Sequence, residues 1–202
     1  MTGIIRTSRI IDRAALPNRF PTHRHDSAFW EELGRAVACF GFLEEILLRA
    51  IFAITGTTEC NSEEKEAAYE SWLQKLDSSL SDPLGKLIDT YTSAINNNSA
   101  CIVQDQDRLL KDLRLASVIR NTICHGSWPP PNTAGASTPF FINNKKEVFA
   151  TEIDVKYLQK VQEEVSNLAC DVMDTVTKMG WQFPGSSGPG EVVWKSVVNQ
   201  DT

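Results

Sequence analysis

One short run of the 202-residue sequence combines an arginine, an amide and a histidine: Arg120-Asn121-Thr122-Ile123-Cys124-His125. Arginine presents a planar, permanently charged fork that binds phosphate oxygens. Histidine exchanges a proton near neutral pH. Together such groups could cleave a phosphodiester by acid–base catalysis without a metal ion. We therefore take Arg120, Asn121 and His125 as the candidate catalytic residues, and we expect no metal site and no cofactor.

The spacing of Arg120 and His125 limits how these residues can cooperate. Five residues of an ideal helix turn through about 500°, so the two side chains lie about 140° apart. Asn121 and His125 are four residues apart and can meet on one face. The last turn must therefore unwind, or a second copy of the helix must supply the missing group, as a two-fold dimer would do.

The residues before the run predict the helix that positions it. Leu109, Leu113 and Ala116 recur at helical spacing, which indicates a helix from about residue 104 to residue 124. Gly126 is a typical stop, and the three prolines at 129–131 forbid continuation. The candidate residues are thus expected at the C-terminal end of this helix.

The remaining periodicity predicts a helical bundle. A long helix is expected from residue 26 or 27 to about residue 55, with a seam that includes Trp30, Leu33, Val37 and Phe40. Further helices are expected after Ser62, from residues 81–83 to about 95, and from Asp154 to Gly180. Mostly apolar segments at 140–142 and 147–150 flank a turn and predict a short hairpin. The fold class is therefore all-α: four to five helices, with a small β-hairpin inserted before the last long helix.

Glu44 interrupts the apolar seam of the first long helix. A seam carboxylate facing a guanidinium can satisfy both charges, so we expect Glu44 to pair with Arg120 across two helices. Trp128 leaves two alternatives, which are stacking on a nucleotide base and packing beneath the proline loop; packing is the commoner role.

Composition limits the class of protein. The net charge of −6 counts against a non-specific nucleic-acid binder. No apolar run is long enough to span a membrane, and five scattered cysteines are typical of reduced, mostly core thiols in a cytoplasmic protein. Cys124 in particular is expected to be buried.

The chain divides into three expected parts: an N-terminal arm over residues 1–25, a helical domain over residues 26–180, and a flexible tail over residues 181–202. The arm is basic, and it is expected to be a solvated terminus. His23 and His25 lack nearby metal-ligand partners and are expected to be solvated with it.

The motif, its place at a helix end and the surrounding helices resemble the HEPN superfamily (higher eukaryote and prokaryote nucleotide-binding domains). The hallmark of that superfamily is an arginine, a polar residue, three further residues and a histidine, matched here by Arg120, Asn121 and His125. A glutamate in the apolar seam of a long first helix, here Glu44, is also similar to members of that superfamily. The resemblance covers roughly residues 26–180.

The resemblance implies a metal-independent endoribonuclease that acts as a homodimer across the motif helices. Many members are toxins, phage-defence effectors or RNA-processing enzymes, and an antitoxin or regulatory partner could restrain such an activity. The ribose 2′-OH would attack phosphorus, so DNA would not be cut. Other members have the fold without activity. A non-catalytic module that binds a nucleotide or a protein therefore stays open as the alternative.

Overall fold

The computed structural model describes residues 8–58, 70, 83–143 and 145–188. In these ranges the α-helices are α1 (Ser27–Gly56), α3 (Leu84–Asn97), α4 (Gln106–His125) and α5 (Val155–Thr177), preceded by a short 3₁₀ turn at Arg13–Ala15. The all-helical fold class is confirmed for this part of the chain. The helix predicted after Ser62 lies outside the described residues.

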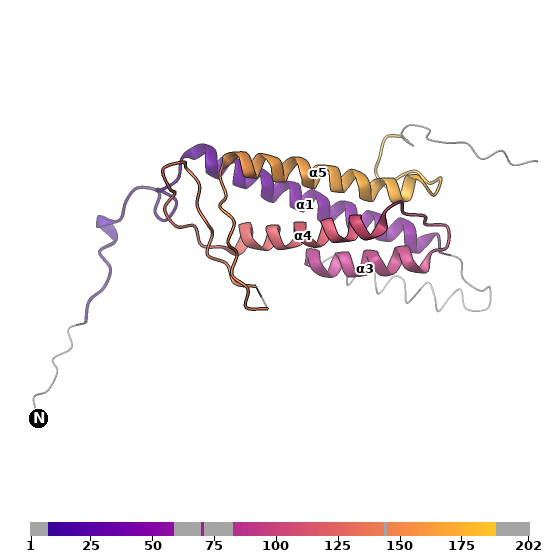
Figure 1. The fold of residues 1–202 in the computed structure, drawn as a ribbon, viewed down its shortest axis with the longest axis horizontal. Coiled ribbons are helices and arrows are strands. Elements are labelled where there is room, and N and C mark those ends of the chain that lie inside the picture. Colours follow the sequence, from indigo (N-terminus) through magenta and orange to yellow (C-terminus); the bar gives the residue numbers. More distant parts are fainter. Residues whose placement is uncertain (1–7, 59–69, 71–82, 144, 189–202) are drawn as a thin grey trace, which may run out of the picture.

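The helices lie along one another in an elongated bundle (Figure 1). Helices α1, α3 and α5 run in one direction and α4 runs in the opposite direction. The most extensive packing is between α1 and α5, whose N-terminal halves are joined where Gln162 Nε2 donates to Glu32 Oε2 at 2.7 Å. Because α4 ends where α1 and α5 begin, the candidate residues lie at that end of the bundle.

The core is formed by aliphatic and aromatic side chains of all four described helices. On α1 the buried face is wider than the predicted seam, because α5 packs on one side of this helix and α3 and α4 pack on another. Ala36, Leu43 and Ile46 are buried as a result, whereas Val37 is 38% exposed and does not belong to the core.

The loop between α4 and α5 covers the motif end of the bundle. It holds isolated antiparallel bridges between Ser127 and Phe140, Ser137 and Ile153, and Ile142 and Val148. The described residues contain no β-strand, so the predicted hairpin is not shown as a pair of strands. No described helix is long and apolar enough to cross a membrane.

The segment that follows α5 is partly packed. Phe183 is only 3% exposed, and Arg49 Nη1 donates to the carbonyl of Pro184 at 3.2 Å. Gly180 and Gly185 adopt positive φ angles of 88° and 82°, which glycine tolerates and which turn the chain back towards α1. Residues 183 and 184 of the tail predicted from residue 181 therefore contact the helical bundle.

Candidate functional site

The end of α4 is fixed by close backbone packing. The N–H of Gly126 donates to the carbonyl of Thr122 at 2.8 Å and closes the last turn. A Cβ atom at residue 126 would lie 2.5 Å from that carbonyl oxygen and 3.0 Å from Cβ of Pro139. Gly126 has an ordinary φ of −71°, so lack of space explains the glycine, and a left-handed cap does not. The predicted stop is confirmed at this residue.

Arg120 is held against the first helix. Its Nε atom lies 3.3 Å from Oε1 of Glu44, and the two side chains are 24% and 25% exposed. The predicted ion pair between these residues is therefore present. Oε1 of Glu44 is buried and accepts no hydrogen bond from the described residues, so the contact is an electrostatic attraction with poor hydrogen-bond geometry.

Asn121 completes the surroundings of the guanidinium. Nη1 of Arg120 donates to Oδ1 of Asn121 at 3.3 Å. The amide thus orients the arginine, and its carbonyl oxygen faces the positive charge. Two of the three candidate residues, together with Glu44, form one polar cluster between α4 and α1.

His125 stands apart from that cluster. It is exposed in the last turn of α4, and no hydrogen bond or ion pair of its side chain is found among the described residues. The helix is regular up to His125, so the separation of about 140° from Arg120 is preserved. Within one chain, the structure brings Arg120 to Asn121 and Glu44 and does not bring His125 to them.

Trp128 belongs to an aromatic cluster at the same end of the bundle. Its ring packs edge-on against Phe29, with ring centroids 5.0 Å apart. His25 stacks on the same phenyl ring at 4.4 Å, and its Nε2 is 3.0 Å from Oγ of Ser137. Packing is therefore the role that the structure supports for Trp128.

The expectation that His25 is solvated is wrong, because it is a buried residue. Burial lowers the pKa of His25 below its ordinary value, and the charge of Asp26 opposes this shift. A sequence signal existed: His25 precedes the N-cap residue Asp26 and meets Trp30 five residues later, as in a hydrophobic staple. His23, by contrast, is half-buried and stacks on Phe20.

The cysteines also differ from expectation. Cys124 and Cys170 are exposed, Cys39 and Cys101 are half-buried, and these four are free thiols. The expectation that Cys124 is buried is therefore wrong. Among the described residues no three side chains of His, Cys, Asp or Glu are grouped so that they could hold a metal ion.

Comparison of this chain with protein-family models, with curated proteins and with solved structures found no match.

Proposed function

We propose that the protein is a metal-independent endoribonuclease of the HEPN type, active as a homodimer. The observation that carries the proposal is the division of the motif. Arg120 is anchored by Glu44 and Asn121, whereas His125 is exposed at the end of the same helix. A second copy packed on the end of α4 would place its own His125 beside a pre-oriented Arg120.

The chemistry follows from the side chains. His125 accepts the proton of a ribose 2′-OH as its oxygen attacks the adjacent phosphorus. The bond from phosphorus to the 5′-oxygen breaks, and that oxygen takes up a proton from the second His125. The products are a 2′,3′-cyclic phosphate and a free 5′-OH. Arg120 stabilises the charge that develops on the phosphoryl oxygens.

The test is cleavage of single-stranded RNA by purified protein in EDTA, with DNA of the same sequence in parallel. Arg120→Ala and His125→Ala should each lower the rate by at least about 100-fold, the usual scale for losing a proton-transfer group or a charge donor. Arg35→Ala, a change of an exposed arginine on α1, is the matched control. Undiminished cleavage by His125→Ala, with the same product ends, contradicts the proposal.

A second candidate is a non-catalytic binding module of the same fold. The specific observation in its favour is that Arg120 is largely engaged by Glu44, in a chain whose net charge is −6. This candidate predicts that the wild-type protein leaves RNA intact and binds a nucleotide or a protein partner in a manner that Arg120→Ala abolishes. For either candidate we propose that the protein is cytoplasmic. An antitoxin or another regulatory partner is proposed only for the nuclease.

A further inference from the structure

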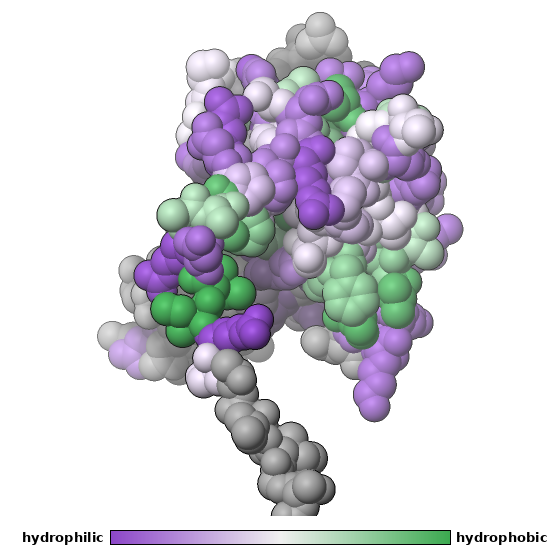
Figure 2. All heavy atoms as spheres, turned by 90° about the vertical axis from the view of Figure 1, so that its left-hand side faces the viewer, coloured by the Kyte–Doolittle hydropathy of each residue, from purple (hydrophilic) through white to green (hydrophobic). Residues whose placement is uncertain are grey.

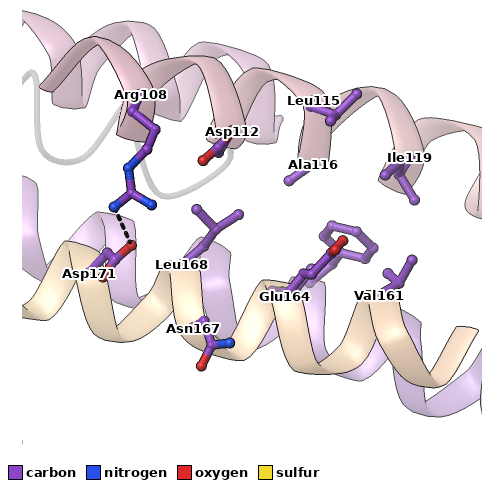
Figure 3. A pocket seen from close by; sticks show the side chains of 12 residues that line it. Arg108, Asp112, Leu115, Ala116, Ile119, Val161, Glu164, Asn167, Leu168 and Asp171 are labelled. Carbon is purple, nitrogen blue, oxygen red and sulfur yellow. Dashed lines mark ion pairs between the residues drawn. The ribbon is translucent and has the colours of Figure 1, made fainter. Parts of the chain in front are cut away.

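A groove with an apolar floor lies between α4 and α5 (Figure 3). It has a volume of about 270 Å³ and is open to solvent on one side. Side chains of the two helices point towards each other across it: Ala116 and Ile119 from α4, and Val161 and Leu168 from α5. Leu115 of α4 lines the edge of the groove, points away from α5 and is 59% exposed, so apolar surface continues outside the groove.

The rim of the groove is acidic. Asp112 of α4 and Glu164 and Asp171 of α5 line it, against a single cation, Arg108, whose Nη2 lies 3.9 Å from Asp171. The volume is below the range of about 300–1,000 Å³ that is typical of pockets for drug-sized ligands. Its size and charge suit a few apolar side chains flanked by cations.

The N-terminal arm has that chemistry. Ile10 and Ile11 are 96% and 74% exposed; Arg9 precedes them, and Asp12 and then Arg13 follow them. Residues 8–25 contain four arginines and one aspartate. The arm leaves the bundle where α1 begins and points away from its body (Figure 1), and Figure 2 shows hydrophobic surface beside the start of the described chain.

We infer that the groove between α4 and α5 binds the N-terminal arm of a second copy of this chain, with Ile10 and Ile11 on its floor and Arg9 and Arg13 at its acidic rim. The arm of the same chain does not occupy this groove: no arm residue lines it, and the arm points away from the bundle beyond its base, where Trp30 Nε1 donates to the carbonyl of Thr22 at 2.8 Å. Two copies can exchange arms reciprocally about a two-fold axis. This contact does not depend on RNA cleavage.

The direct test replaces Ile11 with a photo-crosslinking amino acid in full-length protein. Isotopically light and heavy copies are mixed, irradiated and analysed by peptide mass spectrometry. We expect crosslinks from residue 11 to peptides of α4 and α5 that line the groove, including pairs of one light and one heavy peptide. Crosslinks that are only between peptides of the same isotope, or that avoid the groove, overturn the inference.

Charge reversal supplies an independent test. Arg9→Glu with Arg13→Glu should lower the crosslinking yield at the groove by about tenfold or more, and Asp112→Arg with Glu164→Arg in the partner copy should restore it. Trp181→Asp, a change of an exposed apolar residue at the other end of the bundle, should leave the yield unchanged. Failure of the reversed pair to restore the yield refutes the assigned contact. Arg120→Ala should crosslink like the wild type even if the proposed nuclease activity is absent.

Discussion

Removal of the Glu44 carboxylate tests how firmly Arg120 is held. At the distance of 3.3 Å and an effective dielectric constant of about 20, the Coulomb attraction is about 5 kcal/mol. Desolvation of both groups offsets much of this attraction. Exposed pairs contribute about 0–1 kcal/mol, whereas breaking a fully buried pair costs about 3–5 kcal/mol. With both side chains about one-quarter exposed, we expect a coupling of about 1–3 kcal/mol.

The assay is a double-mutant cycle on the free energy of urea unfolding, with Glu44→Ala, Arg120→Ala and the double variant. The Glu31–Arg35 pair is a matched control, because it joins the same residue types at 2.8 Å with side chains 62% and 61% exposed. Its coupling should be about 0.2–0.5 kcal/mol and should weaken in salt. An equally small coupling for Glu44 and Arg120 would refute the argument that the pair is shielded from water and anchors the guanidinium.

Two further predictions concern the motif end of the bundle. Burial lowers the pKa of His25 below its ordinary 6.5. Its contribution to stability is therefore complete above about pH 6.5 and is lost as the pH falls through the lower pKa of the folded state. In urea unfolding measured over a series of pH values, His25→Gln should reduce the loss of stability at acid pH, and an unchanged loss would contradict this account. Gly126→Ala should destabilise the fold by about 1–3 kcal/mol, because its Cβ would overlap the Thr122 carbonyl. Gly85→Ala in α3, whose Cβ would lie 3.6 Å from Ser117 Oγ of α4, should instead stabilise by about 0.5–1 kcal/mol in thermal unfolding; equal effects of the two changes would rule out the steric account.

Periodicity was sufficient to predict the long helices, because each buries a stripe of apolar side chains that repeats every three to four residues. It also identified Glu44, since a carboxylate in such a stripe requires a partner, and the partner is Arg120. Val37 shows the limit of periodicity, because it lies in the predicted seam and is nevertheless 38% exposed. A stripe predicts one contact face, whereas α1 is packed by helices on more than one side, and the identity of those neighbours depends on the tertiary fold.

The environment of the candidate site could be predicted only in part. Helical geometry correctly separated Arg120 from His125, because that angle is local. For His25 the local signal is only its position before the N-cap Asp26, because its hydrogen-bond partner Ser137 is 112 residues away in the sequence. Contacts of that kind depend on where the loop returns, and turn-forming residues do not specify that position.

The parallel pairing of α1 with α5 has a consequence for synthesis of the chain. The apolar face of α1, which is complete at Gly56, gains its principal partner only when α5 has emerged up to Thr177. At about 5–20 residues per second, that interval of about 120 residues lasts roughly 6–24 s. During this time the nascent chain presents an uncovered aliphatic surface. Holdase chaperones that recognise such surfaces should therefore bind ribosome-attached chains that end before α5 and release those that extend past it.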